Sequence, residues 1–442
     1  MLFSFTIASD SLAGAKPDQL ERLSAELTPV GAERAANSAG TIPAWTGGIT
    51  TPPVPYEPGD HHPDPFSGEA ALFRIDADNL AEYGDFLGPG QTAMLSKYPD
   101  FYIDVFPSHR TAAFPQRIYE MTAQNAVSGS LTEGGNAVVN VAEGFPFPFP
   151  ETAEELIWNH RLRYKGTGST RHINMVAPTA RGAFNEVTIT VKTINPYYQP
   201  GATLESIDNH LLMFSREINS PPRLAGSVLL VYETLNQATQ PRKAWLYNPG
   251  QRRVIRAPNV AYDSPSMSTD GLHVVDMTDM FNGALDRFSW ELKGKREMYV
   301  PYNSYQLHSN QLNYDDLALP GHLDQQYMRY ELHRVWVVEA RLHEGQRHIN
   351  PRRTYYLDED SYQILLAEHY DSNGELWRYS EAHPINFYDV PVFWTTMEVH
   401  YDLNARRYVS FRLDPTKPVP PFNMDMNIRE FTPQALRRQG RR

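Results

Sequence analysis

The most constraining feature of the sequence is a long succession of strand-like segments that begins after residue 182. Apolar and polar residues alternate through most of these segments, and Val, Ile, Tyr, Phe and Trp are frequent, which is typical of strands with one buried face. Turn sequences such as Asn248-Pro249-Gly250 and Asn373-Gly374 separate neighbouring segments, so consecutive segments are expected to form hairpins. The expected strands are 186–193, 227–235, 243–248, 253–257, 289–300, 327–342, 353–358, 363–370, 376–381, 392–403 and 407–413.

Consecutive hairpins without alternating helices predict a single antiparallel sheet. A sheet of about eleven strands tends to curl. We therefore expect a mainly β fold of the α+β class, in which a curved antiparallel sheet forms an incomplete barrel covered by short helices. Periodicity and breaker residues place the helices at 79–86, 92–97, 151–159 and 204–217.

The first third of the chain is rich in proline and is not expected to belong to the sheet. Seven prolines lie within 41–65, and because proline fixes φ and removes a hydrogen-bond donor, neither a helix nor a central strand is expected there. The alternation of Phe and Pro over 145–150 predicts a polyproline II segment lying on the surface with docked aromatic rings. The expected organisation is a shortened signal peptide (1–15), a Pro-rich wrapping segment with short helices (16–150), a half-barrel (151–415) and a basic C-terminal tail (416–442).

Charge and cysteine content exclude several classes of function. The formal net charge is −12, which disfavours binding to the phosphate backbone of nucleic acids. The chain of 442 residues contains no cysteine, which removes thiol catalysis, disulfides, Zn-thiolate sites and the lipidated cysteine of a lipoprotein anchor. The apolar N-terminal run followed by Ala13-Gly14-Ala15 has the form of a secretory signal, so we expect residues 1–15 to be a signal peptide and the protein to be periplasmic.

The motifs that carry common chemistry are absent or wrongly spaced. His343 and His348 are five residues apart, whereas a zincin helix needs a spacing of four, and they lie between expected strands. Asp276 and Asp279 lack the alternating carboxylates and closing Glu of a calcium loop. No Gly-x-Ser-x-Gly elbow is present. The sequence therefore predicts no catalytic residue, no metal site and no cofactor.

Aromatic and aliphatic side chains are concentrated on the strands, and this is where a binding surface is expected. The simplest explanation of these side chains is that they form a packed core beneath a curved sheet. The alternative is that a sheet that curls without closing leaves an apolar groove able to hold a lipid-like ligand. The candidate groove residues are Tyr232, Trp245, Tyr247, Trp336, Val338, Tyr356 and Phe411.

Several blocks of sequence resemble one family of secreted proteins of Gram-negative bacteria, domain-of-unknown-function family 1329. The matching blocks are 27–35 (LTPVGAERA), 40–48 (GTIPAWTGG), 144–148 (GFPFP), 245–254 (WLYNPGQRRV), 279–283 (DMFNG) and 297–303 (EMYVPYN). The resemblance covers about residues 25–415. It implies kinship with the lipoprotein carriers LolA and LolB, whose incomplete barrel is covered by helices, and it supplies no catalytic residues.

The leading functional hypothesis is a non-enzymatic carrier of a hydrophobic ligand, such as a lipid, lipoprotein acyl chains or another apolar compound. The resemblance implies a periplasmic location, peripheral to the outer membrane, and two partners: an outer-membrane protein and an exporter of the resistance-nodulation-division type. The first alternative is a secreted hydrolase acting on an ester or polymer, with His160, His172, Asp276 or Glu297 meeting in a cleft. The second is an envelope scaffold, which a fully packed aromatic face would favour.

Overall fold

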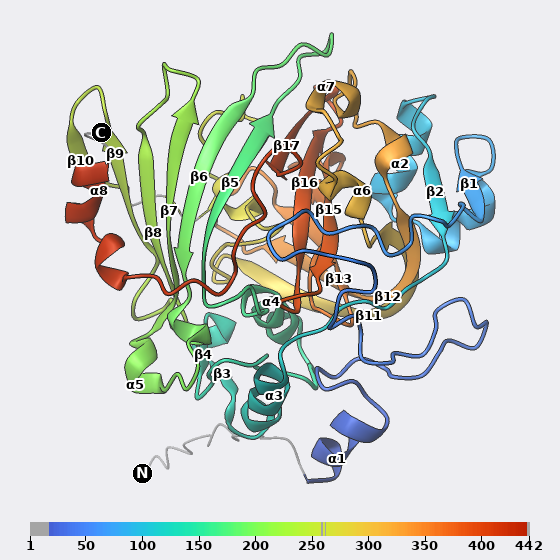
Figure 1. Ribbon diagram of the computed structural model, residues 1–442, viewed down its shortest axis with the longest axis horizontal. Coiled ribbons are helices and arrows are strands. Elements are labelled where there is room, and N and C mark those ends of the chain that lie inside the picture. The colour runs from blue at the N-terminus through green and yellow to red at the C-terminus, as the bar shows by residue number, and fades with distance from the viewer. Residues whose placement is uncertain (1–16, 258–259, 261, 440–442) are drawn as a thin grey trace, which may run out of the picture.

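The computed structural model describes residues 17–257, 260 and 262–439, and its largest feature is a curved 15-stranded sheet (Figure 1). The expected signal peptide lies outside these residues. The strand order is β1-β2-β12-β13-β14-β15-β16-β17-β5-β6-β7-β8-β9-β10, and β11 pairs with β12. The strands are β1 (Phe73–Ile75), β2 (Ile103–Phe106), β5 (Gly168–Val176), β6 (Val187–Ile194), β7 (His210–Ser220), β8 (Val228–Thr234), β9 (Lys243–Asn248), β10 (Arg253–Arg256), β11 (Phe288–Pro301), β12 (Tyr330–Leu342), β13 (Arg352–Asp358), β14 (Ile364–Tyr370), β15 (Leu376–Phe387), β16 (Val392–Asp402) and β17 (Arg407–Leu413).

The sheet is antiparallel except where β2 runs parallel to the start of β12. It curls without closing, because the described residues show no pairing between β10 and β11. A separate small sheet joins β3 (Ser130–Thr132) and β4 (Ala137–Val139). The predicted mainly β architecture with an incomplete barrel is confirmed, although the sheet has more strands than the eleven expected.

All of the strands expected from alternation are present, and six further strands were not predicted: β1, β2, β5 and β7 of the large sheet and β3 and β4 of the small sheet. Residues 204–217 were expected to form a helix, and this prediction is wrong. The helix α5 covers only Leu204–Ile207 and ends at Asp208, which has a left-handed backbone conformation, and β7 follows. Leu, Met and Glu favour helices, but pairing with β6 and β8 overrides this local preference. The strand β5 was also missed, and its first residue belongs to a glycine-rich stretch.

Helices and extended chain cover the sheet. Residues 41–65 contain neither helix nor strand, as predicted. The segment 145–150 is not on the surface: Phe145 and Phe147 are buried together with the prolines between and after them, since the rings pack into the core. The remaining helices are α1 (Pro17–Ala25), η1 (Leu80–Phe86), α2 (Pro89–Lys97), α3 (Gln116–Ser128), η2 (Glu133–Gly135), α4 (Ala153–Arg161), η3 (Pro196–Tyr198), η4 (Val275–Met277), α6 (Tyr305–His308), α7 (Tyr314–Leu317), η5 (Gln325–Tyr327), η6 (Ile428–Glu430) and α8 (Pro433–Gln439).

The β5–β9 part of the sheet has two faces that are covered by different segments. On the outer face, which carries Met213, Leu230 and Tyr247, the C-terminal segment packs through Phe431 and Leu436. The 416–442 segment that was expected to be a tail therefore folds against the sheet over part of its described length. On the inner face, which carries Ile173, Val191, Phe214 and Leu229, the connection between β10 and β11 passes over the sheet and contributes Met267 and Leu272 to a common cluster with β5–β7 and β17. Among the described residues, no helix is long and apolar enough to cross a membrane.

Candidate functional site

A cavity of about 300 Å³ lies between the inner face of β5–β9 and the chain that connects β10 to β11. Its size falls at the small end of the range for pockets that bind small molecules. Most of its wall is apolar. Side chains that contribute to this wall include Ile173, Val191, Phe214, Leu229, Leu246 and Phe411.

The inner wall follows directly from the alternation of side chains along each strand. In β8, Leu229, Val231 and Glu233 line the cavity, whereas Val228 and Leu230 pack on the outer face. The registered pairs Leu229–Leu246 and Leu230–Trp245 carry the same division into β9. Both faces of these strands are therefore apolar: one packs against the C-terminal segment and the other lines the cavity.

The segment that covers the cavity is fixed by polar contacts to strands on the other side of the sheet. The carboxylate of Asp276 accepts a hydrogen bond from Arg353 Nη2 at 2.9 Å and lies 3.0 Å from His348 Nε2. Burial would raise the pKa of Asp276, but Arg353 and His348 outweigh it and hold that pKa below its usual value. Further along, Arg378 Nη2 donates to the carbonyl of Gly271 at 2.8 Å. The segment that covers the cavity is therefore held in place by its own buried polar contacts.

One end of the cavity holds a network of buried charges centred on Asp279. Its carboxylate accepts hydrogen bonds from Arg163 at 2.6 Å, Lys165 at 3.0 Å and Arg412 at 3.2 Å. Burial alone would raise the pKa of Asp279, but these three cations hold it well below its usual range. Burial lowers the pKa of Lys165 to about 8, against the opposing effect of Asp279. Arg412 also donates to Glu398 at 2.6 Å, so three cations share two carboxylates in this network.

Two other cations on the wall lack such partners. Arg161, at the end of α4, is buried, and none of its three guanidinium nitrogens donates a hydrogen bond to a residue that the structure describes. Its nearest carboxylate, that of Glu233, lies 3.8 Å away. Leaving a buried donor unsatisfied costs about 1–3 kcal/mol, and more when the group is charged. Arg216 is half-buried, forms no ion pair within the described part of the chain, and lies 5.9 Å from the centre of the Phe411 ring.

The helix α4 places Arg161 at this wall. Thr152 caps the helix by accepting a hydrogen bond from the backbone of Glu155 at 3.2 Å, and the Glu155 side chain returns the contact to the backbone of Thr152. The guanidinium of Arg161 lies 4.2 Å from the centre of the Trp158 ring on the same helix. The capping box was visible in the sequence as Thr152-x-x-Glu155, but the position of the last helical residue against a cavity was not.

The structure does not bring the seven expected groove residues together. Phe411 lines the cavity. Tyr232, Trp245 and Tyr247 lie on the outer face, where the Tyr232 hydroxyl donates to the carbonyl of Phe431. The other three belong to β12 and β13, away from the cavity: Trp336, Val338 and Tyr356.

The residues considered for a hydrolase also lie in different environments. His160 is buried and contacts the carbonyl of Asp279 at 2.8 Å. His172 is exposed on β5, Asp276 belongs to the cover, and Glu297 accepts a hydrogen bond from Asn37 at 3.1 Å. These four side chains have no common hydrogen-bond partner among those that the structure describes.

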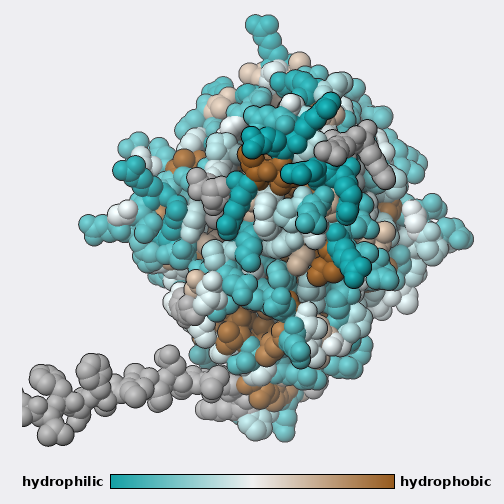
Figure 2. Space-filling view, turned by 90° about the vertical axis from the view of Figure 1, so that its left-hand side faces the viewer, coloured by the Kyte–Doolittle hydropathy of each residue, from teal (hydrophilic) through white to brown (hydrophobic). Residues whose placement is uncertain are grey.

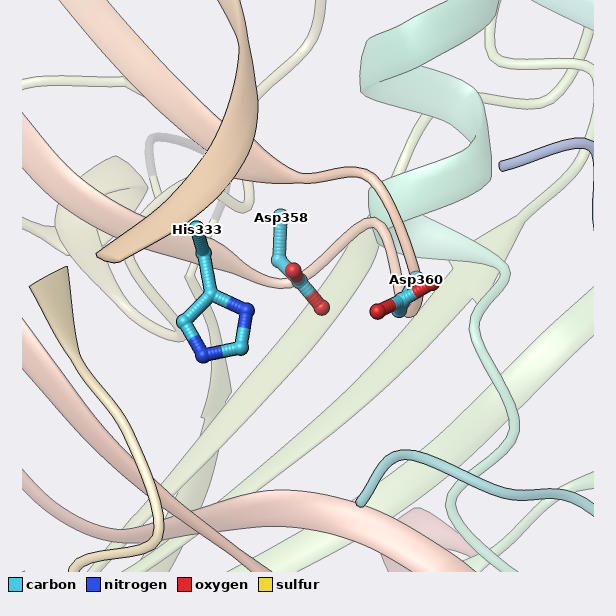
Figure 3. Close-up of side chains that lie close together, drawn as sticks. All are labelled: His333, Asp358 and Asp360. Carbon is cyan, nitrogen blue, oxygen red and sulfur yellow. The ribbon is translucent and has the colours of Figure 1, made fainter. Parts of the chain in front are cut away.

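A second polar cluster, formed by His333, Asp358 and Asp360, lies where the N-terminal segment meets the sheet (Figure 3). Candidate metal-ligand atoms of these three buried residues lie within 4.8 Å of one another. However, Asp360 already accepts two hydrogen bonds from Arg110, at 2.6 and 2.8 Å, so a cation here would face a guanidinium group. Asp358 accepts from Ser361 at 2.6 Å. The contacts fit a polar anchor for the N-terminal segment better than a metal site.

Apart from Phe411, sequence reasoning missed the residues that form the cavity, particularly Arg161, Arg216 and Leu229. The available signal was Arg216, a charged residue between Phe214 and Ile218 on one face of a strand. Such a residue is uncommon on a buried face unless it is paired or faces a cavity. Because 204–217 was interpreted as a helix, this signal could not be used.

Fold and site together define a class of protein in which an open antiparallel sheet and a long covering segment enclose an apolar cavity. The model of the family "Protein of unknown function (DUF1329)" matches residues 74–437, and the chain belongs to this family. The predicted family resemblance is therefore confirmed. A relative in Pseudomonas aeruginosa, "Uncharacterized protein PA3922", is 42% identical over 440 residues, covering 98% of this chain and 96% of the relative.

Two solved structures are similar at low sequence identity. The first is a "putative outer membrane lipoprotein-sorting protein domain" from Vibrio parahaemolyticus, with 13% identity and a TM-score of 0.44, covering 64% of this chain and 97% of that chain. The second is a DUF1329 family protein from Desulfovibrio piger, with 12% identity and a TM-score of 0.44, covering 64% of this chain and 95% of that chain.

Proposed function

We propose that this protein is a non-enzymatic carrier that binds a hydrophobic ligand in the cavity between the inner face of β5–β9 and the β10–β11 connection. The observation that carries the proposal is the cavity itself, whose wall is mostly aliphatic and aromatic. Burying apolar ligand surface contributes about 25 cal/mol per Å², from which the cost of immobilising the ligand is subtracted. A ligand shielded in this way can be carried through water.

The face of the molecule drawn in Figure 2 agrees with an internal binding site. Figure 2 views the end of the molecule at which β10 and α8 lie, and apolar surface occurs there in small patches between polar side chains. Large exposed patches would be the sign of an apolar ligand or partner held on the outside. The interior cavity is the better candidate.

A periplasmic site of action, peripheral to the outer membrane, forms part of the proposal, as do the outer-membrane and exporter partners that the family resemblance implies. Cell fractionation of the native host tests the location. Co-purification of the cross-linked protein with an outer-membrane protein or a resistance-nodulation-division exporter tests the partners. Recovery of the protein only in the cytoplasm would contradict both.

The experiment that tests binding is calorimetric titration of decanol, a single-chain apolar probe, into the detergent-free protein, together with mass spectrometry of organic extracts. Leu229→Gln places a polar group on the cavity wall, and we expect decanol affinity to fall about tenfold, or about 1.4 kcal/mol. Ile255→Gln is the matched control, because Ile255 is exposed and does not line the cavity. Equal losses in both variants, or no binding and no co-purified ligand in the wild-type protein, would contradict a carrier and favour the scaffold.

A further inference from the structure

The charges on the cavity wall do not balance. Five cationic side chains line it, and they face three carboxylates. The cations are Arg161, Lys165, Arg216, Arg242 and Arg412, and the carboxylates are Glu233, Asp279 and Glu398.

Local contacts show which cations are already neutralised. Lys165 and Arg412 pair with Asp279, and Arg412 also pairs with Glu398. Glu233 lies 2.8 Å from Arg242, from which it accepts a hydrogen bond, and it also accepts one from Asn282 at 3.2 Å. The carboxylate of Glu233 lies 3.8 Å from the guanidinium of Arg161, which is too far for a hydrogen bond. Arg161 therefore shares a carboxylate that is already engaged, and its own donors are left free.

A buried guanidinium with free donors beside an apolar cavity is an incomplete ion-binding arrangement. Planar guanidinium groups match the geometry of carboxylates and bind them through two parallel hydrogen bonds. Water could satisfy the donors of a solvent-exposed arginine, but Arg161 is only 3% exposed. The missing acceptor is most simply supplied by whatever occupies the cavity.

We propose that the natural ligand is a single-chain carboxylic acid whose carboxylate accepts hydrogen bonds from Arg161, while its apolar chain lies along the inner face toward Phe214 and Leu229. This inference rests on the proposed carrier function and specifies its ligand class. A cavity of about 300 Å³ suits one chain, because it lies at the small end of ligand pockets.

Arg216 provides an internal control for the assignment. It is a second cation on the same wall without an ion-pair partner among the described residues, but it is half-buried, whereas Arg161 is buried. Glu233, next to Arg161, is paired across the sheet with Leu212, which is four residues from Arg216 on β7. At about 3.3 Å per residue, Arg216 therefore lies roughly 13 Å along the strand from the Glu233 pair. Removing it changes the charge of the cavity without touching the proposed carboxylate contact.

The test compares decanoate with decanol, which have the same chain and differ in the charged group. Both are titrated calorimetrically into the full-length wild-type protein, Arg161→Met and Arg216→Met at one pH and salt concentration. We expect wild-type protein to bind decanoate at least tenfold more tightly than decanol. Arg161→Met should lose at least tenfold in decanoate affinity and keep its decanol affinity within twofold, whereas Arg216→Met should change either affinity by less than threefold.

The outcomes separate this inference from the proposed function. If neither probe binds the wild-type protein, the carrier function itself fails. If decanol binds as tightly as decanoate, or if Arg161→Met weakens both probes equally, a hydrophobic cavity remains and the carboxylate assignment is refuted. A large loss of decanoate affinity in Arg216→Met alone would also refute the assignment to Arg161. Should Arg161→Met fail to fold, the wild-type comparison of the two probes and the variant Arg161→Lys still decide the question.

Discussion

Replacing Asp358 with Asn should make the protein more stable at neutral and alkaline pH. Asp358 is fully buried in the cluster of Figure 3, its Oδ1 has no hydrogen-bond partner among the described residues, and its Oδ2 accepts from Ser361 and Tyr302. Burial, reinforced by the neighbouring carboxylate of Asp360, raises the pKa of Asp358 to about 7. The folded protein therefore prefers the neutral acid, and asparagine has a similar shape without the charge.

The sign follows from comparing the folded and unfolded states. An unfolded Asp has a pKa near 3.9, so the folded state binds this proton more tightly. The stabilising contribution is complete below about pH 4, falls as the pH rises toward 7, and does not change above that. For a folded pKa of about 7, linkage gives a loss of about 1–2 kcal/mol by pH 5 and about 4 kcal/mol by pH 8. Between pH 5 and pH 8, Asp358→Asn should therefore gain about 2–3 kcal/mol relative to the wild type.

The assay is urea denaturation of the wild type and the variant at half-unit steps from pH 5 to pH 8.5, with the difference in unfolding free energy plotted against pH. Subtraction removes the contributions of the other titrating groups, which both proteins share. Asp78→Asn, at an exposed carboxylate, controls for the loss of one charge. A difference that stays constant across this pH range, or that moves against the variant at high pH, would refute the account of a carboxyl kept neutral by burial and by Asp360.

Two further predictions concern packing. Trp245→Ala should lower the unfolding free energy by about 1–3 kcal/mol without changing decanol affinity, because Trp245 packs against Tyr232 on the outer face. Phe411→Ala, on the cavity wall, should weaken decanol binding. If calorimetry showed that only Trp245→Ala weakens decanol binding, the ligand would bind at the outer aromatic face instead of in the cavity. Gly31→Ala should lower the midpoint of thermal unfolding strongly, since the φ of Gly31 is +95° and a Cβ there would lie 1.8 Å from the carbonyl oxygen of Pro148. Gly40→Ala is the control, because Gly40 also has a positive φ but has open space around it. Similar midpoints for the two variants would contradict the steric explanation.

The strands were predictable because their signal is local. Alternation of apolar and polar residues, interrupted by turn sequences such as Asn373-Gly374, is written into short windows of sequence, and β9 and β17 have the predicted bounds. The strand β7 could not be found in this way. Its residues Leu211, Leu212 and Met213 are good helix formers, and only the pairing with β6 and β8, supplied by distant segments, selects the extended conformation.

The binding site was harder to predict because a strand pattern identifies two faces without saying which face encloses a cavity. In β8 and β9 both faces are apolar: Leu230, Tyr232 and Trp245 point one way, and Leu229 and Leu246 point the other. The groove was predicted on the first of these faces because that face carries the aromatic residues. Their partners Phe431 and Leu436 lie almost 200 residues later, so nothing near β9 showed that this face is already covered.

The same reasoning explains why an arginine is a better marker of the site than a tryptophan. A large aromatic side chain on a strand is satisfied equally well by a core or by a ligand, so it does not distinguish between them. A buried guanidinium needs acceptors, and when the surrounding protein supplies too few, the deficit points to something outside the chain. Arg161 has this deficit and lines the cavity, whereas Trp245 has its ring packed against Tyr232. The unsatisfied polar group, set in an apolar wall, is what turns an empty space in the core into a candidate for specific recognition.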